Sequence, residues 1–163
     1  MNAVPVKHYD VYWSGPYEYD PDNDVLLPEI HANHVLYMIC GTHGLYGRNV
    51  PLYIGKTEQS IHTRISQHSW LSEEPDPVKI YTACMGEFVS WMTNFEVQEY
   101  PPLSTRIIEQ VESLLIFAHQ PVYNSRSKLG KNRYDSHVSI FNTGRRGTLY
   151  PEVSTLRWIG DEV

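Results

Sequence analysis

The run Leu52-Tyr53-Ile54-Gly55-Lys56-Thr57 constrains the fold of this chain more than any other stretch. Its apolar and aromatic residues end at a glycine, and the isoleucines that follow, Ile61 and Ile65, lie one helical turn apart. The sequence therefore predicts a strand that ends at Gly55 and a helix over about residues 60–71. A lysine directly after a glycine at a strand end is a group that can meet a phosphate.

Apolar runs elsewhere predict further strands. Residues 34–40 are nearly all apolar, and the turn-forming residues 41–51 join them to the strand at 52–54 as a β-hairpin with a long loop. Alternating polar and apolar side chains at residues 94–100 predict a third strand. One more strand is expected near residues 138–141. The apolar run at residues 78–84 is compatible with either a strand or a short helix.

A long helix is predicted after the third strand. Ser104 or Thr105 caps its beginning, and its apolar pattern continues to about His119. Strands and helices together define an α/β fold class of the α+β type.

Length and charge suggest three parts within one domain. At 163 residues the chain can bury one core. We expect an acidic, aromatic N-terminal arm at residues 1–33 with a short strand near 8–13, a core at 34–124 and a basic, loop-rich extension at 125–163. The net charge of −6 hides this segregation, because residues 1–34 carry six acids and one lysine.

Cysteine usage and hydropathy bear on the cellular setting. Cys40 and Cys84 lie far apart, which indicates neither a zinc site nor a disulfide framework. A reduced, cytoplasmic environment is the expectation. The N-terminus has no signal-peptide pattern, and no apolar run approaches the roughly 20 residues that span a bilayer, so we expect no membrane association.

Two glutamates in the helix at residues 105–119 have different surroundings. Glu109 has polar neighbours, whereas Glu112 lies in a stretch that is apolar on nearly every face. A carboxylate there is costly unless a cation pairs with it. That cation is either Arg64 or Arg106 in a structural salt bridge, or a metal ion, and the helix pattern leaves the two alternatives equal.

Other residues could serve the same chemistry: Tyr37, Tyr53, Lys56, Arg64 and His68. Considered singly, the tyrosines are ordinary strand residues, and the cations and the histidine are ordinary surface groups. Considered together with Glu112, they supply what phosphodiester hydrolysis needs. These needs are a group that activates water, cations that neutralise phosphate oxygens, and a metal ligand.

At this point the chain resembles the GIY-YIG nuclease family over roughly residues 34–124. The second family tripeptide is present unaltered as Tyr53-Ile54-Gly55, while Val35-Leu36-Tyr37 replaces Gly-Ile-Tyr but keeps the tyrosine. Glu112 opens a Glu-x-x-Leu-Ile run, and a Pro-x-Tyr-Asn run ends at Asn124. The resemblance implies a small central three-stranded antiparallel sheet flanked by helices.

The resemblance also implies roles for the marked residues. Glu112 would be the sole protein ligand of one divalent ion, Mg²⁺ or Mn²⁺. Arg64, at the family's helix arginine, would neutralise the scissile phosphate. The loop at residues 38–52 is longer than compact members use, and its His43, Tyr46 and Arg48 are either substrate contacts or part of a surface turn.

The proton transfers are less closely specified. Either Tyr37 or Tyr53 would deprotonate the attacking water, which requires nearby cations to lower the pKa of that tyrosine. His68, where family members carry histidine or tyrosine, could relay the proton. Lys56 would approach the phosphate, and Asn124 would brace the site.

The basic extension begins beside this site and is the predicted DNA-contacting surface. Within residues 125–150, six cations accompany a single acid, Asp135, and these cations are Arg126, Lys128, Lys131, Arg133, Arg145 and Arg146. Neutralising several phosphates would make binding salt-sensitive. The alternative is an exposed solubilising loop. The acidic arm is expected on the far side of the core.

The sequence therefore favours a stand-alone DNA endonuclease, and the resemblance implies that its products carry 5′-phosphate and 3′-hydroxyl ends. Such an enzyme could be restriction-type and act as a homodimer, or be structure-specific. The alternative function is a catalytically inactive nucleic-acid-binding or regulatory protein with the same fold. The sequence does not distinguish DNA from RNA as the substrate, and it does not specify the recognition sequence or the pathway.

Overall fold

A computed structural model describes residues 5–22, 34–91, 101–129 and 136–158. In chain order its elements are β1 (Val6–Tyr19), β2 (His34–His43), β3 (Gly47–Lys56), α1 (Ile61–Ser66), the 3₁₀ helix η1 (Ser69–Glu73), β4 (Val78–Glu87), α2 (Thr105–His119), β5 (His137–Gly144), β6 (Glu152–Ser154) and α3 (Thr155–Trp158). None of the helices within these ranges is long and apolar enough to cross a membrane.

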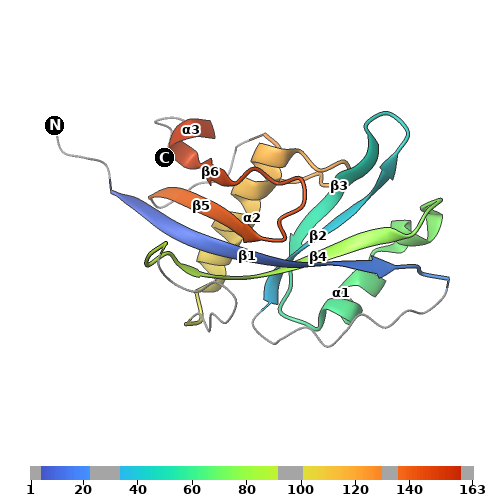
Figure 1. Ribbon diagram of the computed structural model, residues 1–163, viewed down its shortest axis with the longest axis horizontal. Coiled ribbons are helices and arrows are strands. Elements are labelled where there is room, and N and C mark those ends of the chain that lie inside the picture. The colour runs from blue at the N-terminus through green and yellow to red at the C-terminus, as the bar shows by residue number, and fades with distance from the viewer. Residues whose placement is uncertain (1–4, 23–33, 92–100, 130–135, 159–163) are drawn as a thin grey trace.

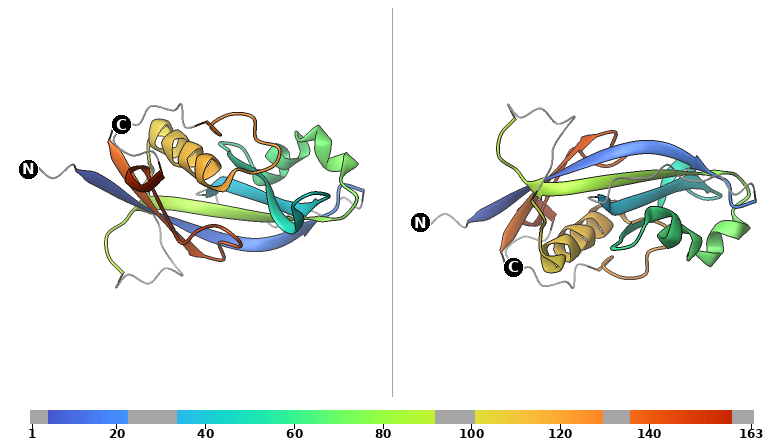
Figure 2. Two further views of the ribbon diagram at one scale, coloured as in Figure 1. Left: turned by 90° about the horizontal axis from the view of Figure 1, so that it is seen from above. Right: turned by 90° about the horizontal axis from the view of Figure 1, so that it is seen from below.

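The strands form one mixed sheet in the order β3-β2-β4-β1-β5-β6. β1 and β5 are parallel, and the other neighbouring strands are antiparallel. β1 and β4 run side by side along the length of the molecule (Figures 1 and 2). The α+β class is therefore consistent with the structure, but the predicted three-stranded sheet is wrong, because the described residues form a sheet of six strands.

The N-terminal strand differs most from the prediction. Residues 6–19 pair with both β4 and β5, so this part of the expected arm is an internal strand and not an appendage. Its polar residues obscured the strand pattern. Asp10 is buried and accepts a hydrogen bond from Thr143 Oγ1 at 2.7 Å. Pro16, which has no N–H to donate, lies where the pairing register with β4 shifts.

β2 has one predicted neighbour and one that was left open. It pairs with β3 as the expected hairpin, and on its other side it pairs with β4, whose apolar run at residues 78–84 left strand and helix equally open. The strand expected at residues 94–100 lies outside the described residues. Because β4 is buried on both faces along much of its length, it lacks the polar alternation that marks a half-exposed strand.

The two predicted helices have different outcomes. α2 is confirmed: Ser104 Oγ accepts from Ile107 N, and the helix ends at His119 before Gln120, which is left-handed at φ 49°. The helix predicted at residues 60–71 is wrong in length. α1 ends at Ser66, after which backbone hydrogen bonds span three residues and form η1.

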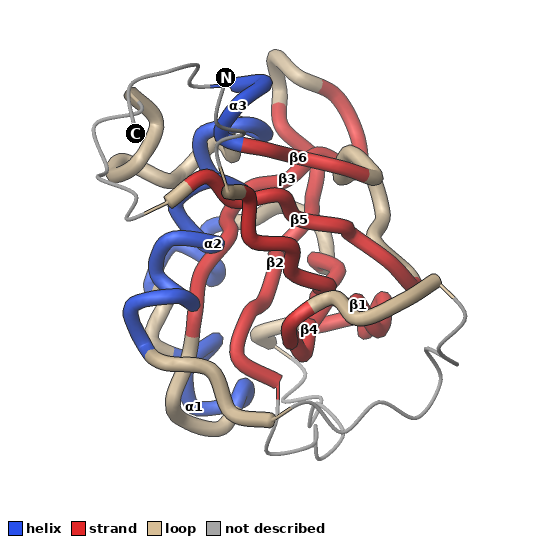
Figure 3. The backbone as a smooth tube through the Cα atoms, turned by 90° about the vertical axis from the view of Figure 1, so that its left-hand side faces the viewer, coloured by secondary structure: helices blue, strands red, loops and turns tan. Residues whose placement is uncertain are grey.

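Apolar residues on the two faces of β2 belong to two different clusters. Leu36 and Met38 pack with α2 and with β1, whereas Tyr37 and Ile39 pack with α1 and η1. Successive strand side chains point to opposite faces, so α1 and α2 cover different faces of β2. α2 runs along one side of the sheet (Figure 3). β3, the edge strand beside β2, lies between the two helices.

Candidate active site

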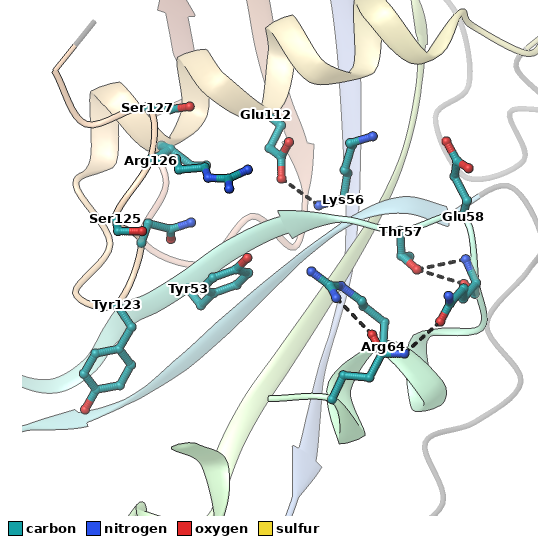
Figure 4. A pocket seen from close by; sticks show the side chains of 14 residues that line it. Tyr53, Lys56, Thr57, Glu58, Arg64, Glu112, Tyr123, Ser125, Arg126 and Ser127 are labelled. Carbon is teal, nitrogen blue, oxygen red and sulfur yellow. Dashed lines mark hydrogen bonds between the residues drawn. The ribbon is translucent and has the colours of Figure 1, made fainter. Parts of the chain in front are cut away.

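A cleft of about 530 Å³ opens along the outer edge of β3, where α1, α2 and the segment after α2 approach it (Figure 4). Predicted residues that line it are Tyr53, Lys56, Arg64, Glu112, Asn124 and Arg126. They come from four different parts of the chain. The structure thus brings together most of the groups that the sequence singled out, and it leaves Tyr37 and His68 behind the cleft wall.

Gly55 makes room for two aromatic rings. A Cβ atom at this position would lie 2.7 Å from Tyr37 Oη and 2.7 Å from Tyr53 Cε1, distances that Cβ contacts essentially never show. The rings of Tyr37 and Tyr53 lie nearly parallel, with centroids 5.9 Å apart. The glycine of the Tyr53-Ile54-Gly55 run is therefore required by packing between the two tyrosines.

Tyr37 and His68 form a hydrogen-bonded pair inside this wall. Tyr37 Oη lies 2.8 Å from His68 Nε2, and the tyrosine is fully buried. Burial, with the nearby Tyr53 adding to it, raises the pKa of Tyr37 well above its ordinary value. Burial and the Arg64 guanidinium lower the pKa of His68 to about 4. At neutral pH the pair is therefore an uncharged imidazole beside an uncharged phenol.

Arg64 enters the cleft from α1. Its guanidinium interacts electrostatically with the hydroxyls of both Tyr37 and Tyr53. Its Nη1 also donates to Gln67 Oε1 at 3.0 Å, and Gln67 Nε2 donates to Gln59 Oε1 at 3.1 Å. This chain of hydrogen bonds fixes the arginine between α1 and the end of β3, where its charge faces the open cleft.

Residues that line the cleft form hydrogen bonds with the outward-facing backbone groups of β3, which is an edge strand. Asn124 Oδ1 accepts from Ile54 N and its Nδ2 donates to Ile54 O, both at 2.9 Å. One outward position earlier, Tyr123 N donates to Leu52 O at 2.8 Å. Edge strands leave such groups unpaired unless something covers them. Asn124 therefore acts as a side-chain substitute for a neighbouring strand.

Glu112 occupies the next outward position along the same edge. Its Oε1 accepts from Lys56 N at 2.9 Å, and the residue is half-buried. Burial raises the pKa of Glu112, while the Lys56 N–H bond and the charges of Lys56 and Arg64 oppose the rise. Oε1 of the carboxylate thus accepts a hydrogen bond from the backbone, while the side chain lines the cleft.

The sequence left open a structural salt bridge between Glu112 and Arg64 or Arg106, and the structure shows a different ion pair. Beside the cleft, Lys56 Nζ pairs with Glu109 Oε1 at 3.0 Å. Glu109 is more exposed than Lys56, so this pair contributes little to stability. Arg64 acts on Glu112 only through its charge.

A metal ion would have Glu112 as its ligand in this cleft. The described residues contain no group of three or more His, Cys, Asp or Glu side chains that could hold a metal. Mg²⁺ does not need such a group, because it keeps several waters and binds through one or two carboxylates together with substrate phosphates. A single half-buried carboxylate in an open cleft fits that requirement.

The four predicted DNA-contacting cations that the structure describes do not all line the cleft. Arg126 is exposed and points between Glu112 and Tyr53 in Figure 4. Lys128 Nζ donates to Val122 O at 3.3 Å. Arg145 and Arg146 donate to backbone carbonyls of Gly15 and Leu149, away from the cleft lining. Lys131 and Arg133 lie outside the described residues.

Several cleft residues were not predicted. They are Thr57, Glu58, Gln59, Gln67, Ile116, Tyr123, Ser125 and Ser127. Tyr123 carried a signal in the sequence, since it adjoins Asn124 in the Pro-x-Tyr-Asn run. The glutamines carried none, because only the fold brings residue 59 to residue 67.

Comparison of the chain with protein-family models, with curated proteins and with solved structures finds no match. The likeness to the GIY-YIG family therefore rests on the residues themselves. The reaction that the protein catalyses is therefore inferred from the residues that line the cleft.

Proposed function

We propose that the protein is a metal-dependent DNA endonuclease of the GIY-YIG type, which leaves 5′-phosphate and 3′-hydroxyl ends. One observation carries this proposal: a single half-buried carboxylate, Glu112, shares an open cleft with Lys56, Arg64 and Arg126. Three cations line the cleft with two carboxylates, Glu112 and the exposed Glu58, and this excess of positive charge suits a phosphodiester that arrives with its own negative charge. Glu112 would hold a divalent ion, which would supply further positive charge beside the phosphate.

The cations have separate positions with respect to a phosphate in the cleft. Arg64 approaches from α1, and Arg126 approaches from the segment after α2 (Figure 4). A phosphate between them would be contacted from two sides. Arginine suits this task, because its planar guanidinium can donate two parallel hydrogen bonds to phosphate oxygens.

Tyr53 is the tyrosine that we assign to the attacking water. It lines the cleft, whereas Tyr37 is fully buried behind it and has a raised pKa. Tyr53 would accept a proton from the water while the water oxygen attacks phosphorus, and the Arg64 guanidinium lies beside the Tyr53 hydroxyl. The bond from phosphorus to the 3′ oxygen would break, and that oxygen would take up a proton from solvent. Tyr37 and His68 would position the Tyr53 ring, which has its centroid 4.5 Å from that of His68.

The deciding experiment is incubation of the purified chain with supercoiled plasmid and Mg²⁺ or Mn²⁺, with a chelator as control. The diagnostic variant is Glu112→Gln, because the amide oxygen can still accept from Lys56 N while the charge is lost. Glu109→Gln is its matched control, since it removes an equal charge from the same helix outside the cleft lining.

We expect metal-dependent nicking or cutting by the wild type and by Glu112→Gln at least a hundredfold less. Glu109→Gln should cut at nearly the wild-type rate. Glu112→Ala should also be inactive. Cleavage by Glu112→Gln at the wild-type rate would refute the role of Glu112. Absence of cleavage with every divalent ion, together with retained DNA binding, would favour the inactive binding protein instead.

A further inference from the structure

A row of aromatic rings leads out of the cleft along the β2–β3 hairpin. Trp70 lies 6.5 Å from Tyr53 and 4.7 Å from Tyr123, measured between ring centroids. Tyr123 lies 6.3 Å from His43, and His43 stacks on Tyr46 at 5.0 Å. The hairpin that carries the outer rings projects at the upper right of Figure 1. The row joins the cleft to the hairpin tip.

The outer part of the row is accessible and two of its rings are held in place. Tyr46 is 64% exposed and Tyr123 is 39% exposed. Leu45 N donates to His43 Nδ1 at 3.3 Å, and Tyr123 Oη donates to Glu74 Oε1 at 2.9 Å. Partly exposed rings that are held by neighbouring rings and by hydrogen bonds form a surface that is preorganised for flat ligands.

We propose that this aromatic row binds the unpaired bases of a single-stranded segment next to the scissile phosphate, an inference that rests on the nuclease function proposed above. The occupant follows from continuity with the cleft, because Tyr123 belongs to the row and also lines the cleft beside Arg126. A nucleic-acid strand with one phosphate among the cleft cations would continue across these rings.

The chemistry of the row selects single strands over duplex. Aromatic side chains bind unpaired bases by stacking, with little dependence on base identity. In a duplex the base faces are already stacked on one another and cannot reach a protein ring without being extruded. The preferred substrate is therefore a single strand, an overhang or a branched end, and a continuous duplex should be a poorer one.

The test measures binding separately from cleavage. The full-length chain, with a chelator present, is titrated into a fluorescently labelled single-stranded DNA, the RNA of the same sequence, and the blunt DNA duplex. Tyr46→Ala removes the outermost ring. Leu45→Ala is the matched control, since it truncates a neighbouring side chain that is 78% exposed and outside the row. Tyr46→Phe keeps the ring and loses only the hydroxyl.

We expect the single strand to bind more tightly than the duplex and Tyr46→Ala to weaken single-strand binding by about tenfold. Leu45→Ala and Tyr46→Phe should bind as the wild type does. Comparing the single-stranded DNA with the RNA of the same sequence identifies which nucleic acid the aromatic row prefers, and either preference supports the proposal.

Equal binding of single strand and duplex, or equal effects of Tyr46→Ala and Leu45→Ala, would overturn the inference even if the wild type cuts plasmid. Conversely, Tyr46-dependent binding of single strands without cleavage in any metal would uphold the stacking surface and refute the endonuclease. The same titration with a proline-rich peptide distinguishes a protein partner. Tyr46-dependent binding of that peptide in place of the single strand would also overturn the inference.

Discussion

Replacing Gly55 by alanine tests the packing behind the cleft. The added methyl group would lie 2.7 Å from Tyr37 Oη, 2.7 Å from Tyr53 Cε1 and 2.8 Å from Tyr37 Cζ. Tyr37 is fully buried, so its ring cannot swing into solvent to relieve these contacts. Overpacking of this kind costs about 1–3 kcal/mol in a close-packed core.

Two smaller contributions modify that cost. Displacing the Tyr37 hydroxyl weakens its hydrogen bond to His68, which is worth about 0.5–1.5 kcal/mol. In the opposite direction, alanine restricts the unfolded chain and stabilises by about 0.4–1 kcal/mol. The net expected loss in the free energy of unfolding is about 2 kcal/mol. For a chain of this size, that lowers Tm by about 4–8 °C.

Urea and thermal unfolding, followed by circular dichroism, measure this loss. Gly44→Ala is the matched control, because a Cβ atom there meets nothing within 4 Å. It should leave stability unchanged or raise it slightly. If Gly55→Ala proves as stable as Gly44→Ala, the claim that the glycine is required by the two tyrosines is refuted.

Three further outcomes are expected. Asn124→Leu should destabilise the protein by about 2–3 kcal/mol in urea unfolding, since it leaves both polar groups of Ile54 without their partner, whereas exposed Ser125→Ala should be neutral. The difference in the free energy of unfolding between wild type and His68→Gln should shrink as pH falls from about 6.5 to about 4, because the unfolded histidine takes up a proton in this window and the folded one does not. A difference that stays constant across this range would contradict the lowered pKa of His68. Arg64→Ala should reduce the cleavage rate at least tenfold with nearly unchanged DNA affinity in a filter-binding assay, and equal losses in both would indicate a binding role only.

The sequence predicted those parts of the site that depend on short-range patterns. Glu112 was separated from Glu109 by the apolar character of its neighbours along one helix, and the structure places Glu112 in the cleft and Glu109 in a more exposed ion pair. The bounds of α2 likewise depend on a few adjacent residues, as does the end of β3, which the sequence placed at Gly55 and the structure places one residue later at Lys56. Patterns of this kind involve neighbouring residues and can be recognised in a single sequence.

Features that depend on distant contacts were not predictable. The acidic and aromatic composition of residues 1–33 indicated an arm with only a short strand near residues 8–13. In the structure a hydroxyl on β5 pairs with the buried Asp10 and a register shift accommodates Pro16, so the strand extends over residues 6–19. Similarly, the sequence could not rank Tyr37 against Tyr53. Both are tyrosines in paired strands, and only the packing of α1 against the sheet buries the first and exposes the second to the cleft.

The sealed edge of β3 links the integrity of the site to the solubility of the protein. Outward backbone groups of this strand are satisfied by Tyr123, Asn124 and Glu112, which also line the cleft. An uncovered edge recruits strands from other molecules and promotes aggregation. A lineage that discarded Glu112 or Asn124 would therefore expose a template for self-association. Selection against aggregates would preserve these side chains even in a descendant that no longer cuts nucleic acid.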